Sequence, residues 1–353
     1  MIRTLSLAAS LTIVSALALS GCAAAAGGTP TDKGAADEIT LGYFANVTHA
    51  PALVGLEKGF IEDSLGDTKL TTETFDAGPA AIEALSAGAI DATFIGPSPA
   101  INTFIKSRGQ SAVIVAGATT GGASLVVRDG IDSAADLTGA TLATPQLGNT
   151  QDVALRAWLA DEGFKTSIVG DGDVVITPTE NADAFTLFKS GDIDGAWLPE
   201  PWASRFVVEG GAHVLVDEAS LWPDGVFPTT VLLVNKQFLA EHPDTVTALL
   251  EAHVGSITWL NEHPADAASV INAVIEAETG KPVPAEVIDS ALAKVTFAVD
   301  PAADTFPTLV DHAVTAGTGN KGELDGLFDF SLLNKVLADL DIEPVSSDGL
   351  GKE

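Results

Sequence analysis

A sequence pattern that occurs twice constrains the fold of this chain more than any other feature. Residues 84–92 read Ala-Leu-Ser-Ala-Gly-Ala-Ile-Asp-Ala, and residues 187–195 read Leu-Phe-Lys-Ser-Gly-Asp-Ile-Asp-Gly. In each copy a helix pattern ends at the glycine, a short apolar strand follows, and a Pro-x-Pro turn (97–99 and 199–201) precedes a second helix pattern. Two copies of the whole helix–strand–helix pattern predict two similar lobes.

The rest of the chain alternates strand-like and helix-like segments, which predicts an α/β fold with largely parallel sheets. Residues 230–235 form a strand pattern that departs from this alternation, and we expect it to return the chain to the first lobe. Residues 237–340 are mostly helical in pattern. A length of 353 residues also favours two compact lobes over a single core.

Composition excludes several classes of function. The chain has 48 acidic and 17 basic side chains, a formal net charge of −31, which repels phosphate backbones and argues against a nucleic-acid partner. One cysteine cannot form an intramolecular disulfide, a thiolate zinc cluster or a CxxC redox site. The histidines are scattered, and no P-loop, dinucleotide fingerprint or Gly-x-Ser-x-Gly elbow is present. We therefore expect no metal, no cofactor and no enzymatic activity.

The N-terminus is typical of an export signal. Arg3 supplies a basic start, residues 5–19 are an apolar run too short to span a bilayer, and Leu19-Ser20-Gly21-Cys22 resembles the bacterial lipobox. Cleavage before Cys22 removes residues 1–21 and leaves the cysteine for lipidation, and residues 22–38 follow as a flexible tether. The alternative is an ordinary signal peptide that happens to contain a cysteine.

Motifs along nearly the whole mature chain resemble those of the extracytoplasmic substrate-binding proteins of ABC importers. The nitrate/sulfonate/taurine group is the most similar branch, and binders of thiamine-pyrimidine precursors are related to it. The resemblance rests on the lipobox, Leu41-Gly42-Tyr43-Phe44, His49-Ala50-Pro51, Glu57-Lys58-Gly59-Phe60, Gly78, Ala84-Leu85-x-x-Gly88-x-Ile90-Asp91, Gly96-Pro97-Ser98-Pro99-Ala100, Asp136-Leu137-x-Gly139, Asp194-Gly195-Ala196-Trp197 and Glu200-Pro201-Trp202.

This resemblance implies a type II periplasmic-binding-protein fold, in which two α/β lobes joined by two crossovers close on a small molecule. We place the crossovers near Ser124 and Val226, so that residues 39–124 and 226–353 form lobe 1 with the C-terminal helices, and residues 125–225 form lobe 2.

The resemblance also implies a function. The chain is expected to be a monomeric, lipid-anchored, extracytoplasmic receptor that captures an aliphatic sulfonate, taurine or nitrate. It would deliver this solute to a membrane permease with a cytoplasmic ATPase. Alternatives are a binder of a thiamine-pyrimidine precursor, an extracellular solute sensor, and an enzyme similar to thiamine-pyrimidine synthases, which is disfavoured because the cysteine-rich signature of those enzymes is absent.

An anionic ligand of so acidic a protein needs local donors, which helix N-termini with hydroxyl or amide side chains supply. In open α/β sheets ligands bind beyond the carboxyl ends of strands. Four turns in such positions (46–50, 97–99, 119–122 and 146–151), the strand end at Trp197 and the presumed return crossover give the candidate ligand residues Asn46, His49, Ser98, Thr119, Thr120, Asn149, Thr150, Trp197, Glu200 and Thr229.

Several of these candidates also have a structural interpretation. Ser98 and Thr150 are suited to be N-caps of their own helices, His49 to be a solvated loop residue, and Trp197 to be part of the core. Glu200 repels an anion and attracts an amine, yet a carboxylate is favourable in the first turn of a helix in any case. The repeat aspartates Asp91 and Asp194 are typical of turn capping rather than of acid–base chemistry.

Overall fold

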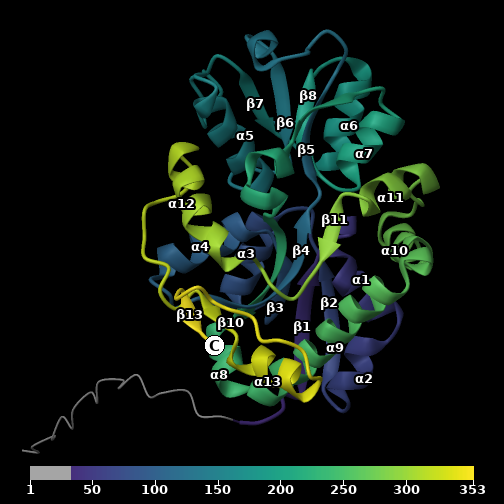
Figure 1. The fold of residues 1–353 in the computed structure, drawn as a ribbon, viewed down its shortest axis with the longest axis vertical. Coiled ribbons are helices and arrows are strands. Elements are labelled where there is room, and N and C mark those ends of the chain that lie inside the picture. The colour runs from purple at the N-terminus through teal and green to yellow at the C-terminus, as the bar shows by residue number, and fades with distance from the viewer. Residues whose placement is uncertain (1–32) are drawn as a thin grey trace, which may run out of the picture.

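The computed structural model of the chain describes residues 33–353. The predicted export signal, the predicted lipidation site Cys22 and most of the predicted tether lie outside these residues. Within the described part of the chain, no helix combines the length and the apolarity that a membrane crossing requires. The described residues form two lobes, each built on one β-sheet with helices packed on its faces (Figure 1).

The sheet of lobe 1 has eight strands, and its central part follows the order β4-β10-β3-β1-β2. Strands β1, β2 and β3 are parallel, whereas β10 runs antiparallel to β3 and β4. Strands β11 and β12 pair with β4, and β13 pairs with β12. The bounds are β1 Glu38–Tyr43, β2 Lys69–Thr74, β3 Ala92–Ile95, β4 Ala112–Gly121, β10 Pro228–Asn235, β11 Val295–Phe297, β12 Phe328–Asp329 and β13 Gly351–Lys352.

The sheet of lobe 2 has five strands in the order β7-β6-β8-β5-β9. Strands β6, β7 and β8 are parallel, and β5 runs antiparallel to both of its neighbours. The bounds are β5 Ala123–Val127, β6 Thr141–Thr144, β7 Val175–Pro178, β8 Gly195–Pro199 and β9 His213–Asp217.

Both sheets are mixed rather than largely parallel, which corrects the expectation from the sequence. Strands linked through a helix run parallel, but the chain enters lobe 2 directly from β4 onto β5 and returns on β10. Strands that arrive from the other lobe in this way run against those neighbours. The expected return of residues 230–235 to the first sheet is confirmed by β10.

Helices cover both sheets, and the C-terminal region is helical as predicted. Helix α9 packs against α1, α2 and α13, and α12 contacts both α4 of lobe 1 and α5 of lobe 2. The bounds are α1 Ala50–Glu57, α2 Phe60–Leu65, α3 Gly78–Ala87, α4 Pro97–Ser107, α5 Thr150–Asp161, α6 Asn181–Ser190, α7 Trp202–Val208, α8 Lys236–Glu241, α9 Pro243–Glu262, α10 Pro264–Thr279, α11 Ala285–Leu292, α12 Phe306–Thr315 and α13 Ser331–Asp339.

The chain crosses between the two sheets twice. The first crossing is short, because Gly121 ends β4 and Ala123 already belongs to β5. The second runs from β9 to β10 through two short 3-10 helices, η3 Glu218–Leu221 and η4 Pro223–Gly225. Sheet membership assigns strands rather than lobe limits, so the limits 124/125 and 225/226 stay a prediction.

The repeated pattern has the same structure in both lobes. Gly88 and Gly191 end α3 and α6 with the left-handed φ values of 71° and 89° that favour glycine. The carboxylate of Asp91 accepts a hydrogen bond from Thr40 N–H at 2.8 Å, and that of Asp194 accepts one from Thr141 N–H at 2.8 Å. Each aspartate therefore ties the start of one strand to its parallel neighbour, which confirms a structural role.

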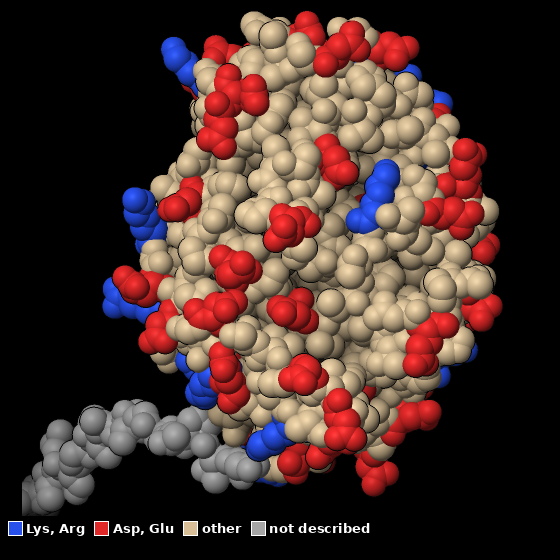
Figure 2. Space-filling model, viewed as in Figure 1, with Lys and Arg blue, Asp and Glu red and all other residues tan. Residues whose placement is uncertain are grey.

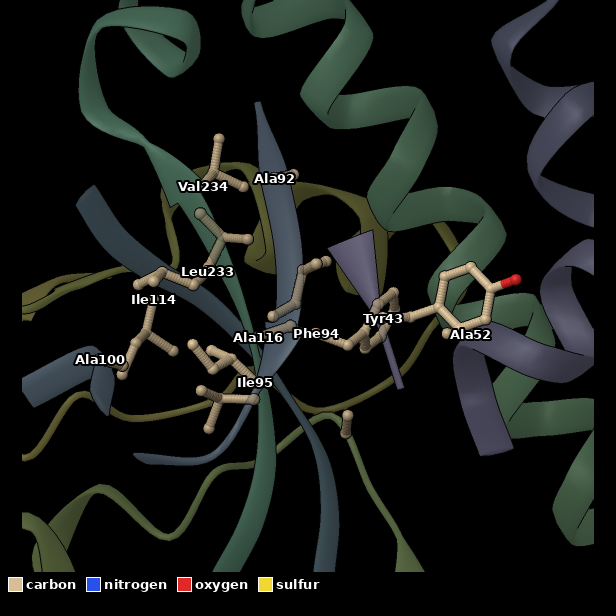
Figure 3. Close-up of a cluster of buried hydrophobic side chains, with 14 of the residues drawn as sticks. Tyr43, Ala52, Ala92, Phe94, Ile95, Ala100, Ile114, Ala116, Leu233 and Val234 are labelled. Atoms are coloured by element: carbon tan, nitrogen blue, oxygen red, sulfur yellow. The ribbon is translucent and has the colours of Figure 1, made fainter. Parts of the chain in front are cut away.

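Apolar side chains from both faces of the sheets form the cores. Phe94 and Ile95 of β3, Ala116 of β4 and Leu233 of β10 are buried together at the centre of lobe 1 (Figure 3). Fully burying a large side chain of this kind contributes about 1.5–3 kcal/mol. The cores hold the ends of the strands in place, and the helices that begin there face the other lobe.

The second crossover contains a buried carboxyl group. Glu218 of η3 is 2% exposed, and its Oε2 accepts a hydrogen bond from Trp197 Nε1 at 2.7 Å. Burial raises the pKa of Glu218 to about 7, and the hydrogen bonds from the two indoles of Trp197 and Trp222 oppose that rise. Trp197 is therefore fully buried, and its indole N–H is bonded to a carboxyl group of the second crossover.

Glu218→Gln is expected to change how the stability of the protein depends on pH. The wild-type carboxyl holds its proton up to about pH 7 when folded but releases it near its ordinary pKa of 4.5 when unfolded. Its contribution is thus complete below about pH 4.5 and is lost as the pH rises toward 7. Between about pH 5 and pH 8 the wild type should lose roughly 2–3 kcal/mol of unfolding free energy relative to the variant. Denaturant unfolding of both proteins measures this, and a pH-independent difference would contradict it.

Candidate ligand-binding site

A cavity lies where the two lobes meet. Phe44, Asn46, Thr48, His49, Asp76, Gly96 and Thr229 line it from lobe 1, and Pro145, Asn149, Thr150, Gln151, Asn181 and Pro199 line it from lobe 2. Its volume is about 20 Å³, counted as the space that the centre of a water molecule can occupy. One water needs about 10–15 Å³ by the same measure, so the cavity fits a group of a few atoms rather than a whole organic molecule.

Helices from both lobes begin at this cavity. Asn149 and Thr150 open α5, Asn181 is the first residue of α6, and Gly96 directly precedes α4. Each of these helices follows a strand of its own lobe, so their N-termini meet beyond the carboxyl ends of the strands. The first N–H groups of a helix have no partner within the helix and carry partial positive charge. The site thus attracts an anion with backbone dipoles.

Several buried polar atoms at this edge have no hydrogen-bond partner in residues 33–353. They are Ser98 Oγ, Thr119 Oγ1, Thr150 Oγ1, Asn181 Oδ1 and Thr230 Oγ1. The N-caps of α4 and α5 are Gly96 and Asn149, so the interpretation of Ser98 and Thr150 as capping residues is wrong. A buried polar atom without a partner costs about 1–3 kcal/mol. Of this set, Thr150 and Asn181 line the cavity, where a ligand can satisfy them.

His49 is a neutral hydrogen-bond donor in the wall of the cavity. The side chain is 2% exposed and stacks on Phe44, with ring centroids 4.3 Å apart. Its Nδ1 accepts a hydrogen bond from Phe44 N–H at 3.3 Å, which leaves the ring proton on Nε2. Burial lowers the pKa of His49 to about 3, so the ring is uncharged near neutral pH. The interpretation as a solvated loop histidine is wrong.

Two asparagines bridge the lobes at the cavity. Asn149 Oδ1 accepts a hydrogen bond from Gly78 N–H at 3.1 Å, and Asn46 Oδ1 accepts one from Trp202 Nε1 at 3.2 Å. The lobes approach so closely that a Cβ on Gly96 would lie 2.3 Å from Thr150 Oγ1. The structure therefore shows the closed arrangement of the two lobes.

Glu200 stabilises the closed arrangement away from the cavity. Its carboxylate is fully buried, and it accepts hydrogen bonds from Lys294 Nζ at 2.8 Å and from Ser204 N–H at 3.0 Å. Lys294 belongs to the segment between α11 and β11 of lobe 1, whereas Glu200 belongs to lobe 2. Ser204 also bonds Ser290 across the same boundary, with oxygens 2.9 Å apart. We call this set of four residues the interlobe latch.

The structure brings together half of the residues that the sequence analysis selected. Asn46, His49, Asn149, Thr150 and Thr229 line the cavity, and their contact with a ligand stays a prediction. The other five are absent from the lining: Ser98 lies in the first turn of α4, Thr119 and Thr120 lie on β4, Trp197 lies in the core of lobe 2, and Glu200 lies in the interlobe latch.

Sequence reasoning missed other lining residues, among them Thr48, Asp76, Gln151 and Asn181. Asn181 carries the same signal that selected Thr150, because it is a polar residue at the start of a helix that follows a strand. Asp76 has no such signal in a chain with 48 acidic residues. Among residues 33–353, no three His, Cys, Asp or Glu side chains are grouped closely enough to hold a metal ion.

Lys294→Met is expected to shift the protein toward an open arrangement of its lobes. The change leaves the Glu200 carboxylate without a cation in the closed form, whereas water solvates it once the lobes separate. Because Lys294 is partly exposed, we expect a cost of about 1–3 kcal/mol rather than the larger values typical of fully buried pairs. Small-angle X-ray scattering should show a larger radius of gyration than in the wild type or in Lys335→Met, an exposed lysine on α13. Equal radii would contradict the latch.

Comparison with known proteins agrees with this arrangement. The profile of the NMT1-like family matches residues 32–275. A Brucella abortus protein named only as a binding protein is 27% identical over 216 residues, which are 60% of this chain and 63% of the relative. The taurine-binding periplasmic protein of Escherichia coli is 27% identical and covers 51% of this chain and 54% of the relative. The nitrate/nitrite binding protein NrtA of Synechococcus elongatus is 27% identical and covers 68% and 57%. The match thus spans less than two thirds of each of these relatives.

Solved structures share the fold at low sequence identity. The alkanesulfonate-binding protein SsuA of Xanthomonas axonopodis, bound to MOPS, has a TM-score of 0.67 and 20% identity over 81% of this chain and 96% of that chain. The periplasmic nitrate-binding protein NrtA of Synechocystis has a TM-score of 0.71 and 16% identity over 87% and 90%. The expected type II periplasmic-binding-protein fold is confirmed. Because its profile matches more than half of the sequence, the chain belongs to the NMT1-like family.

Proposed function

We propose that this protein is the solute-binding receptor of an ABC importer. It captures a small anionic or zwitterionic solute of the aliphatic sulfonate, taurine or nitrate class by closing its lobes, and it delivers the solute to a membrane permease with a cytoplasmic ATPase. The observation that carries this proposal is the interlobe cavity, where the unpartnered hydroxyl of Thr150, a group that can donate to an oxyanion, lies among the N-termini of α5 and α6.

The chemistry of the cavity matches a small oxyanion. Backbone N–H groups, hydroxyl groups and the Nε2–H of His49 are donors, and no lysine or arginine lines the cavity. Figure 2 shows Asp and Glu side chains spread over the surface, where they outnumber Lys and Arg. The surface carboxylates create a negative electrostatic potential around the protein, and salt in solution screens it. Neutral donors inside the cavity bind an anion without depending on that potential. The names of relatives that bind taurine and nitrate, and of a structural neighbour that binds alkanesulfonates, support the same solute class.

Binding rather than catalysis fits the residues that face the cavity. The lining offers threonine hydroxyls and a neutral histidine, but the only cysteine of the chain is Cys22, which precedes the described residues. Nucleophilic catalysis needs an activated nucleophile beside a base that a third group orients. His49 Nδ1 is engaged by a backbone N–H, so no such chain of three groups is formed. We propose that the protein is a receptor and not an enzyme.

Thr150→Val is expected to weaken solute binding by about tenfold, because the variant keeps the shape of the side chain and removes the hydroxyl that a solute oxyanion would bond. Isothermal titration calorimetry and thermal-shift assays with taurine, ethanesulfonate and nitrate measure this effect. Thr247→Val is the control, since its hydroxyl bonds Pro243 O on α9 and faces no cavity. If the wild type binds none of the three solutes, the proposed solute class is refuted. If Thr150→Val and Thr247→Val bind a solute with equal affinity, the Thr150 hydroxyl does not contact that solute.

We also propose that the protein works outside the cytoplasm as a monomer held to the membrane by lipid on Cys22. The sequence before the described residues supports this anchor, because Leu19-Ser20-Gly21-Cys22 resembles the lipobox.

Cys22→Ser is expected to move the protein from the membrane fraction to the soluble fraction of its host, because acyl chains supply stable anchoring. Fractionation and immunoblotting measure the distribution, with Ser20→Ala as a control that keeps the cysteine. Retention of Cys22→Ser in the membrane fraction would contradict the anchor.

A further inference from the structure

A second, larger hollow adjoins the interlobe cavity, and we call it the outer groove. It shares Phe44, Asn46, Asp76 and Asn181 with the cavity. Its volume of about 500 Å³ compares with about 20 Å³ for the cavity by the same measure. A solute whose head occupies the cavity therefore has room for a much larger second part in the outer groove.

The two hollows differ in charge. The cavity is lined by neutral donors and one acidic residue, whereas the outer groove is lined by three carboxylates, those of Asp76, Glu180 and Glu278. Two cations, Arg205 and Lys281, also line the groove. The Nε of Arg205 is bound to Glu209 Oε2 at 2.5 Å, so this guanidinium is already paired. Carboxylates thus exceed available cations in the outer groove.

Asp76 stands where the cavity and the outer groove join. It is the only charged residue in the lining of the cavity, and it makes no hydrogen bond or ion pair with any residue of 33–353. A simple anion in the cavity would be repelled by this carboxylate, because the two like charges would share the lining of one small cavity. A solute with a positive group beside Asp76 turns the same carboxylate into an attractive contact.

Aromatic rings border the same junction. Phe44 lines both hollows, and Phe75, the residue before Asp76, lines the outer groove. The faces of aromatic rings attract organic cations, and quaternary ammonium groups are recognised in this way. The aromatic rings also offer an apolar wall to a hydrocarbon spacer.

Building on the proposed function, we propose that the solute is an elongated zwitterion. Its oxyanion head binds the helix N-termini and Thr150 in the cavity, and an amine or quaternary ammonium group at the other end lies in the outer groove beside Asp76 and Phe75. Asp76 is then the residue that selects a zwitterion over a simple alkyl anion.

The test compares two sulfonates of the same shape and different tail charge. One is trimethylammoniopropanesulfonate, and the other is its isostere with an uncharged tail, in which a tert-butyl group replaces the trimethylammonium group. Calorimetry on the wild type is expected to show at least about tenfold tighter binding of the zwitterion. The carboxylate analogue of the zwitterion, measured alongside, distinguishes a sulfonate head from a carboxylate head.

Asp76→Asn is expected to bring the ratio of the two affinities close to one, and the wild-type ratio is expected to shrink as sodium chloride is added. Glu73→Gln is the matched control, because Glu73 is an exposed carboxylate on β2 that lines neither hollow. It should keep the wild-type ratio. Thermal unfolding of all three proteins confirms that each is folded.

Equal affinity of the wild type for both sulfonates would overturn the zwitterion and leave the proposed receptor intact. A preference that persists in Asp76→Asn would overturn the role of Asp76. Failure of the wild type to bind these three elongated compounds, when it does bind taurine, ethanesulfonate or nitrate, would also overturn the elongated zwitterion. Failure to bind any of the six compounds would instead overturn the solute class on which the inference rests.

Discussion

The unpaired N–H groups at the start of helices are the constraint on which this structure depends. A helix cannot satisfy its own first N–H groups, and burying them without partners is costly. Here α4 of lobe 1 and α5 and α6 of lobe 2 all begin at the boundary between the lobes. One such group, Gly78 N–H at the start of α3, finds its partner in Asn149 of the other lobe. Closure of the lobes and the proposed capture of an anion would therefore both give these N–H groups hydrogen-bond partners.

Charged side chains lie mostly on the surface of this protein, whereas mostly neutral groups line the interlobe cavity. The surface carries a large excess of carboxylates, while helix N-termini and a neutral imidazole line the cavity, so that the proposed anion-binding elements include no lysine or arginine. Glu200 is an exception, because its carboxylate is fully buried. The Lys294 ammonium balances its charge, and the Ser204 N–H donates a hydrogen bond to it. Glu200 joins the two lobes and does not line the cavity.

The fold was more predictable from the sequence than the site. Glycine stops, strand–helix alternation and the repeated Asp91 and Asp194 turns are local sequence signals, and the structure contains each of them, although both aspartates bond a neighbouring strand more than 50 positions away. The short strand β11 has no such signal, because its pairing with β4 is set by tertiary contact within a region of helical pattern. Site residues depend on which strand ends meet across the lobes. Thr150 was selected from its place at a helix start and lines the cavity, whereas Asp76 lines it but was not selected among so many carboxylates. Glu200 was selected but does not line the cavity, and its partner Lys294 lies 94 positions away, beyond the reach of any local sequence signal.

The two crossovers are neighbours, and this fixes the kind of motion that the lobes can make. They leave lobe 1 from the adjacent strands β4 and β10, and Gly121 N–H donates to Phe227 O at 3.0 Å. They enter and leave lobe 2 on the adjacent strands β5 and β9, where Ser124 pairs with Asp217. Two tethers bound side by side permit rotation about the line through them and resist sliding or separation. Rotation of one lobe about an axis through the two crossovers would move all the residues that face the cavity from that lobe together, along arcs about that axis.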